Sequence, residues 1–174
     1  TTLYSSAASY VYRRQVLGLY ELMERITSAF PDVLFEGCSG GGGRFDAGFA
    51  YYMPQIWTSD NTDAVSRLTI QYGTSLVYPI SMTTAHVSAI PNHQTGRKTS
   101  FETRGNAAMS AVFGYELDLT KMSQEDKDQV KEQVACYKEI RKLIQYGNFY
   151  RLKSPVETNE AAWMFVSDDK RDVC

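Results

Sequence analysis

Residues 33–63 hold most of the side chains in this chain that could do chemistry. The segment reads VLFEGCSGGGGRFDAGFAYYMPQIWTSDNTD and combines four consecutive glycines with a thiol, an arginine and several carboxylates. Glycine loops present backbone N–H groups to anions, which makes a phosphate site one interpretation. However, no Lys-Ser/Thr pair follows the glycines, and the GxGxxG spacing is not followed by a proper helix and a distant acid. The sequence therefore argues against a phosphate site.

We interpret residues 39–44 as a loop that follows a strand, where glycines let a flat polar ligand lie against the backbone. Cys38 and Arg44 then lie at the edge of that ligand. A flexible surface turn is the alternative, although four glycines carry an entropic cost that a turn does not need. Because no base adjoins Cys38 in the sequence, we expect it to contact a ligand rather than to be a reactive thiol.

Asp60 has two interpretations that the local sequence leaves open. It follows the strand-like PQIWTS, where a barrel strand would deliver its side chain to a catalytic rim. It also lies where a helix N-cap would lie, so Asp60 or Ser59 capping the next helix is the structural alternative. For Asp63 we expect a capping role, because a carboxylate in the first turn of that helix favours its positive end.

The sequence gives the other polar candidates less support for a catalytic or metal-binding role. Glu36 is expected to face a cation across the core, and Asp46 to pair with Arg44. His86 and His93 are the only histidines. They lack HExxH spacing, so we predict no metal site. No GxSxG elbow is present for a serine nucleophile.

Composition limits the classes of protein that fit. The 174 residues, 43% of them hydrophobic, suit about one domain with a real core. A net charge of -2 gives no basic field for nucleic acid or anionic membrane, so we expect a small polar partner. No apolar run approaches the roughly 20 residues of a membrane span, and the N-terminus lacks signal-peptide order. Three widely spaced cysteines suit reduced thiols, which predicts a cytoplasmic protein.

Hydrophobic periodicity predicts helices that alternate with short strands. The predicted helices are 9–30, closed by Pro31, then 61–72, closed by Gly73, then 101–113, and one that starts at Ser123 and ends at Gly147. The predicted strands are 33–35, 54–57, 75–80 and 115–119, with a long loop after Ile80. Beyond Gly147, residues 149–156 and 161–166 are predicted strands without an intervening helix.

This alternation predicts an α/β fold with a parallel sheet and right-handed crossovers. A doubly wound sheet shows its phosphate fingerprint after the first strand, whereas a (β/α)8 barrel has functional loops after many strands. Here the loops after the first three strands are rich in polar and aromatic groups, which favours the barrel. A barrel needs eight strands in about 250 residues. The chain is therefore expected to be the second half of a barrel over residues 1–146, followed by the start of a β-domain over 147–174.

Four long strings carry a family resemblance. FEGCSGGGGRFDAG, YYMPQIWTSDNTDA, QYGTSLVYPISM and AHVSAIPNHQTGR closely resemble the α-galactosidases of glycoside hydrolase family 36, and the resemblance covers nearly the entire chain. That family has a (β/α)8 catalytic domain followed by a C-terminal β-sandwich. The resemblance implies hydrolysis of terminal α-galactosyl units of melibiose, raffinose and related sugars, with retention of configuration and no cofactor. Members are often tetramers, so a homo-oligomer is an implied expectation.

The resemblance also implies residue roles. Asp60, the aspartate of WTSD, is the implied general acid/base, and the implied galactose contacts are Cys38, Gly40, Gly41, Arg44 and Trp57. The family nucleophile is the aspartate of a KWD motif, which does not occur in this sequence; the family order would place it just before Thr1. A retaining glycosidase needs two carboxyl groups about 5 to 5.5 Å apart. We therefore expect the chain to need the remainder of the barrel and to be inactive alone.

Two other functions remain open at this point. Plant raffinose and stachyose synthases share the barrel and transfer galactose to sugars rather than to water. A noncatalytic galactoside-binding fragment is the other class.

Overall fold

The computed structural model describes residues 2–38, 40–43 and 45–174. Two sheets are present in these residues. The larger sheet has four parallel strands in the order β1-β2-β3-β4, and the smaller pairs β5 and β6 antiparallel. The elements in chain order are α1 (Thr2–Ala29), β1 (Glu36–Gly37), α2 (Ala47–Tyr52), β2 (Gln55–Trp57), α3 (Ala64–Ser75), β3 (Thr83–Ser88), α4 (Phe101–Met109), β4 (Val112–Glu116), α5 (Gln124–Tyr146), β5 (Asn148–Lys153) and β6 (Ala162–Val166), with 3-10 turns at Ile80–Met82 and Leu119–Lys121.

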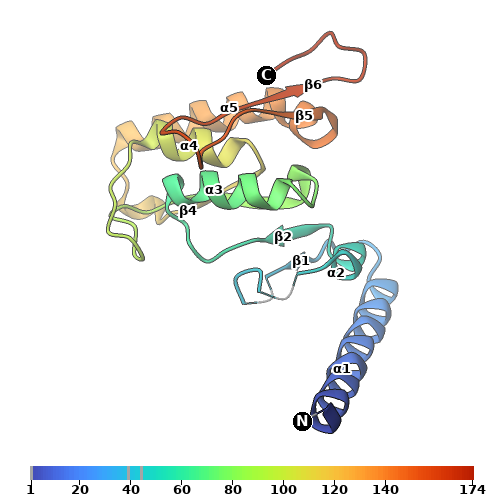
Figure 1. Ribbon diagram of the computed structural model, residues 1–174. Helices are drawn as coiled ribbons and strands as arrows, with labels where there is room; N and C mark the ends of the chain where they lie inside the picture. Colours follow the sequence, from blue (N-terminus) through green and yellow to red (C-terminus); the bar gives the residue numbers. More distant parts are fainter. Residues whose placement is uncertain (1, 39, 44) are drawn as a thin grey trace.

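The helices form a layer on the larger sheet. Figure 1 shows α3 and α4 stacked over that sheet, α5 beside them, and β5–β6 against α5 near the C-terminus, while α1 projects away from the body. Each parallel crossover contains a helix, α2, α3 or α4. The predicted parallel α/β arrangement is thus confirmed.

Two apolar clusters hold the layers together. In the first, Ala85 and Val87 of β3 pack against Phe101 and Ala108 of α4, all at most 7% exposed. The second joins Ile80, Ile144 and Phe165, which come from a turn, α5 and β6. The first cluster fixes the helix layer on the sheet, and the second fixes the smaller sheet on α5.

Several helix ends lie where the sequence predicts them. The α1 helix ends at Ala29, two residues before Pro31. Ser123 caps α5 by accepting a hydrogen bond from the backbone N–H of Asp126 at 3.1 Å, and Gly147 follows its last residue. Helix ends of this kind can be predicted from sequence, because they are marked by particular residue types next to the helix.

The first predicted strand, 33–35, is wrong in position. Val33 and Leu34 are 51% and 71% exposed and precede β1, which consists of Glu36 and Gly37 paired with Gln55 and Ile56 of β2. An apolar run alone does not determine which residues pair, because pairing depends on the neighbouring strand.

The third predicted strand, 75–80, is also wrong. The α3 helix continues through Gly73 to Ser75, where a glycine lowers helix stability without ending the helix. Leu76 and Val77 are 61% and 76% exposed in the following turn. The actual strand is β3, with sequence TTAHVS, inside the region predicted as a loop. The apolar pattern does not predict β3 because several of its residues are polar, although five of the six are buried.

Two smaller differences concern β4 and α2. The β4 strand begins at Val112 and ends at Glu116, about three residues before the predicted 115–119. The helix predicted as 101–113 ends at Met109, because Ser110 and Ala111 turn the chain into β4. The short α2 helix was not predicted. Its N-cap, Asp46, accepts a hydrogen bond from the backbone N–H of Phe49 at 2.8 Å.

Two features are absent from the described residues. None of the helices there is long and apolar enough to cross a membrane. Nor does that part of the chain hold a group of three or more His, Cys, Asp or Glu side chains arranged to bind a metal ion.

Candidate active site

A cavity of about 560 Å³ lies at the carboxyl end of the parallel sheet. All four parallel strands contribute to it, through Glu36 of β1, Trp57 of β2, His86 of β3 and Glu116 of β4. The carboxyl ends of parallel strands meet at one edge, so side chains distant in sequence converge there. The remaining lining residues come from the following loops: Cys38, Asp60, Thr62, His93 and Gln94.

Asp60 presents an exposed carboxylate to this cavity. The Trp57 indole Nε1–H donates a hydrogen bond to Asp60 Oδ1 at 3.1 Å. The cap of α3 is Asp63, whose Oδ2 accepts from the backbone N–H of Ser66 at 3.0 Å. Ser59 Oγ instead accepts from the backbone N–H of Asn61. The helix therefore does not use Asp60, and the capping alternative for Asp60 and Ser59 is wrong.

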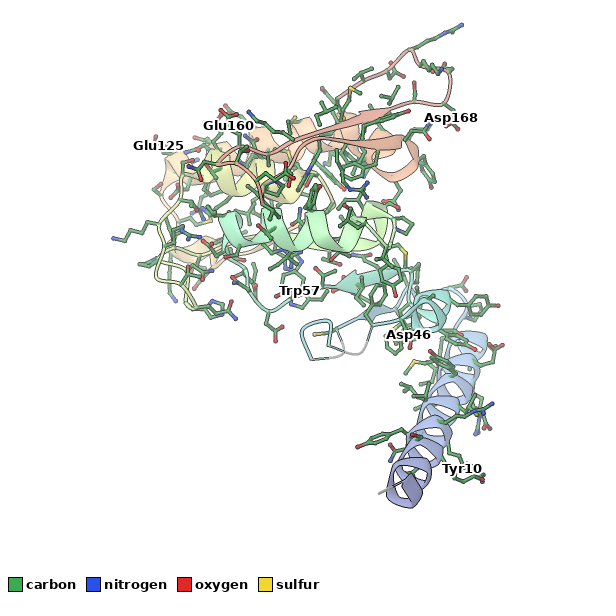
Figure 2. All side chains as sticks on the ribbon, viewed as in Figure 1. Tyr10, Asp46, Trp57, Glu125, Glu160 and Asp168 are labelled. Carbon is green, nitrogen blue, oxygen red and sulfur yellow. The ribbon has the colours of Figure 1, made fainter. Side chains whose placement is uncertain are left out.

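The Trp57 ring contacts two side chains, His86 and Arg67. The His86 ring stacks on it with centroids 4.6 Å apart and an interplanar angle of 27°. The Arg67 guanidinium of α3 lies 4.9 Å from its ring centroid and donates to the Thr84 carbonyl at 2.6 Å. Figure 2 shows Trp57 below α3, the helix that carries Arg67. Burial lowers the Arg67 pKa to about 10, which still leaves a cation at neutral pH.

Burial favours the neutral form of the His86 imidazole. Burial lowers its pKa below the usual 6.5, against the opposing effects of Glu116 and Glu36 and with a smaller contribution from Arg67. Its Nδ1 is buried and has no hydrogen-bond partner in the described residues. A Cβ at Gly114 would lie 2.9 Å from His86 Cδ2, so the glycine of β4 makes room for the ring.

The glycine loop packs against the segment that carries Asp60. Gly40, Gly41 and Gly42 have φ values of 69, 74 and 83°, a region that L side chains rarely adopt. A Cβ at Gly41 would lie 2.8 Å from Asp60 Oδ2, and one at Gly42 would lie 2.4 Å from the Thr58 carbonyl oxygen. These two glycines thus allow a close approach between loops, while Gly40 faces open space.

Glu36 and Asp46 each accept a hydrogen bond from a hydroxyl group. Thr84 Oγ1 donates to Glu36 Oε2 at 2.9 Å. The Tyr20 hydroxyl of α1 donates to Asp46 Oδ1 at 2.6 Å, and Figure 2 shows Asp46 where α1 meets α2. The predicted partner of Asp46, Arg44, lies outside the described residues.

The structure brings together part of the predicted site. Cys38, Trp57 and Asp60 line one cavity, and Gly41 touches Asp60. Gly40 is not among the lining residues, and Arg44 lies outside the described residues. Sequence reasoning did not assign six further lining residues to the site: Glu36, Thr62, His86, His93, Gln94 and Glu116. A signal for Glu36 is available in the sequence, because it directly follows the strand-like run 33–35.

Comparisons with known proteins agree with this geometry. Residues 2–147 match the Melibiase family. The chain is 72% identical over 157 residues to alpha-galactosidase 1 of Pediococcus pentosaceus, covering 90% of this chain and 21% of that protein. It is 67% identical over 159 residues to alpha-galactosidase AgaA of Geobacillus stearothermophilus, covering 91% and 22%. The chain therefore spans about a fifth of the length of the curated relatives that it matches.

Solved structures give the same result. A crystal structure of an AgaA variant in complex with raffinose superposes with a TM-score of 0.91 at 66% identity, covering 92% of this chain and 22% of that one. The galactosidase domain of the α-galactosidase–sucrose kinase AgaSK gives a TM-score of 0.87 at 59% identity, covering 88% and 21%. The predicted fold class, part of a (β/α)8 barrel with the start of a β-domain, is confirmed by these matches.

Proposed function

The chain belongs to the Melibiase family, and from this premise we propose that it is part of a retaining α-galactosidase. The substrates are terminal α-D-galactosyl residues of galacto-oligosaccharides such as melibiose and raffinose. The observation that carries the proposal is the carboxylate of Asp60 at the carboxyl edge of a parallel sheet, in a chain 72% identical to an α-galactosidase. The complex of AgaA with raffinose supports the choice of substrate.

In this proposal Asp60 is the general acid/base. It protonates the oxygen that joins galactose to the leaving group and then removes a proton from the attacking water. Trp57 supports this role, because its indole N–H donates a hydrogen bond to Oδ1 of the carboxylate and so orients a side chain that lines the cavity. The proposed contacts of the galactosyl unit are Cys38, Gly40, Gly41, Arg44 and Trp57. Because three cysteines are widely spaced in the sequence, we also propose a cytoplasmic location.

The test of this proposal replaces Asp60 by Ala in the complete polypeptide of which this chain is a part. An aryl α-galactoside has a good leaving group and needs little acid assistance in the first step, whereas melibiose needs a proton on a sugar hydroxyl. We expect melibiose turnover to fall by about 100- to 10,000-fold and formation of the galactosyl-enzyme from the aryl substrate to be largely kept. Equal losses on both substrates would point to a positioning role instead.

We also propose that residues 1–174 alone are inactive. Retention requires a nucleophilic carboxylate as well as an acid/base, and the family's KWD motif does not occur in this sequence. Glu36 and Glu116 line the cavity but do not belong to such a motif. The isolated chain should therefore show no release of aryl alcohol above background, and clear turnover would contradict the claim.

A further inference from the structure

The loop of residues 89–100, between β3 and α4, is fastened to the segment that follows Asp60. Asn92 is 4% exposed, and its Nδ2 donates to Thr62 Oγ1 at 2.9 Å. Arg97 forms an ion pair with Asp63, whose side chain is 1% exposed and which also caps α3. Both ends of the loop tip are thus attached to neighbours of Asp60 rather than free in solvent.

This attachment holds His93 and Gln94 at the cavity. Asn92 Oδ1 accepts hydrogen bonds from the backbone N–H groups of Gln94 and Thr95, each at 3.0 Å. The turn is therefore closed around the buried Asn92 side chain. His93 and Gln94 line the cavity together with Asp60, and both are exposed. Neither side chain makes a hydrogen bond to another described residue, so both are available to a ligand.

The cavity has a sheet end and a loop end. Glu36 and His86 belong to strands and form the inner part, next to Trp57. His93 and Gln94 belong to a loop beyond the strand ends. A substrate whose galactosyl unit lies against the sheet therefore extends its leaving group toward the loop end. In the proposed function, Asp60 protonates the oxygen between the galactosyl unit and the leaving group. The leaving group therefore begins next to Asp60.

We propose that His93 and Gln94 bind the hydroxyl groups of a sugar leaving group and so set the preference for oligosaccharides over aryl galactosides. The inference rests on the α-galactosidase function proposed above. An imidazole and an amide each offer hydrogen-bond donors and acceptors, which match the hydroxyl groups of a leaving sugar. An aryl group offers no such hydroxyls, so it gains nothing from these two side chains. Arg97 is a positioning residue that acts through the loop.

The experiment measures kcat/KM of the complete polypeptide on raffinose and on p-nitrophenyl α-galactoside. His93→Ala and Gln94→Ala should each lower kcat/KM for raffinose by about 3- to 10-fold, the effect of one lost hydrogen bond. The same variants should change kcat/KM for the aryl substrate by less than about 2-fold. The inhibition constant of free galactose should stay unchanged, because galactose alone occupies only the inner part.

Lys98→Ala is the matched control, since Lys98 is exposed in the same loop and does not line the cavity. It should leave both substrates unaffected. Arg97→Ala should reproduce the selective loss on raffinose, and Arg97→Lys should restore part of it, which a general loss of folding would not do.

Three outcomes separate the claims. If the unmodified protein turns over neither substrate, the proposed α-galactosidase function is wrong. If the unmodified protein is active but His93→Ala and Gln94→Ala lower both substrates equally or neither, the inference about the leaving group is wrong. Weaker inhibition by galactose in these variants would also overturn it, because the side chains would then contact the galactosyl unit.

Discussion

Asp60 has neighbours of two kinds, an indole that donates a hydrogen bond and a glycine that leaves space. Trp57 Nε1 fixes Oδ1 at 3.1 Å, while the backbone of Gly41 lies so near Oδ2 that a methyl group there would be 2.8 Å away. The carboxylate therefore has little freedom to rotate without losing a hydrogen bond or meeting the loop. Such restriction matters for a proton donor, since small displacements of a catalytic group lower rates strongly.

The two glycines Gly40 and Gly41 offer a matched test of this arrangement. Their φ values of 69 and 74° impose similar strain on an alanine, about 1 kcal/mol of the free energy of unfolding. Only at Gly41 does the added methyl meet Asp60. Gly41→Ala should therefore lower kcat on raffinose by about tenfold or more, whereas Gly40→Ala should keep kcat and raise KM if Gly40 borders galactose.

Thermal unfolding of both variants provides the control for the backbone strain. Similar losses of melting temperature with different losses of kcat would assign the difference to the Asp60 contact. If the two variants lose kcat to the same extent, the contact between Gly41 and Asp60 has no catalytic consequence.

At the scale of elements, the sequence predicts helices well and the site-bearing strand poorly. The α5 helix has a capping serine and a regular apolar stripe, both local features. The β3 strand reads TTAHVS; its two threonines and Ser88 are buried, and His86 lines the cavity. Hydrophobic patterning assumes that buried residues are apolar, so it fails where a strand carries a site.

The same reasoning explains which site residues the sequence could predict. Cys38, Trp57 and Asp60 lie near recognisable motifs within one segment. His86 and Glu116 join them only because β3 and β4 pair in a register that sets His86 opposite Gly114. Register depends on contacts between strands distant in sequence, and no local pattern in this chain encodes it.

The contact between α1 and α2 gives a pH-dependent prediction. The Tyr20–Asp46 hydrogen bond lowers the pKa of Asp46 below 3.8 and raises that of Tyr20 to about 12. The depressed carboxyl pKa contributes stability above about pH 4, which is lost as the pH falls through the folded pKa. The raised phenol pKa contributes stability below about pH 10, which is lost as the pH rises through about 12.

Tyr20→Phe should therefore cost about 1 kcal/mol at neutral pH and less at both extremes. Urea unfolding of the complete polypeptide at about pH 3, 7 and 11 measures the difference. Tyr51→Phe is the control, because Tyr51 of α2 is 79% exposed. A cost for Tyr20→Phe that does not vary with pH would mean that the hydrogen bond to the carboxylate is not its origin.

At the scale of the whole molecule, the smaller sheet is tied to the barrel part by both apolar and polar contacts. Phe165 of β6 packs with Ile80 and Ile144 in one buried cluster. Arg151 of β5 donates from Nε to Ser75 Oγ at 2.8 Å and from Nη2 to the Ser75 carbonyl, at the end of α3. The proposed boundary at Gly147 thus marks a change of topology, and the core continues across it.

This continuity predicts the response to a cavity in the cluster. Phe165 is 3% exposed, so Phe165→Ala should cost about 3 to 5 kcal/mol. If the cluster is cooperative, hydrogen exchange should accelerate together in β5, β6 and the last turns of α5. Acceleration confined to β5 and β6 would instead show that residues 147–174 unfold separately. Arg171→Ala, in the segment that follows β6, is the control, because its side chain is 85% exposed and its loss removes no packing from the cluster.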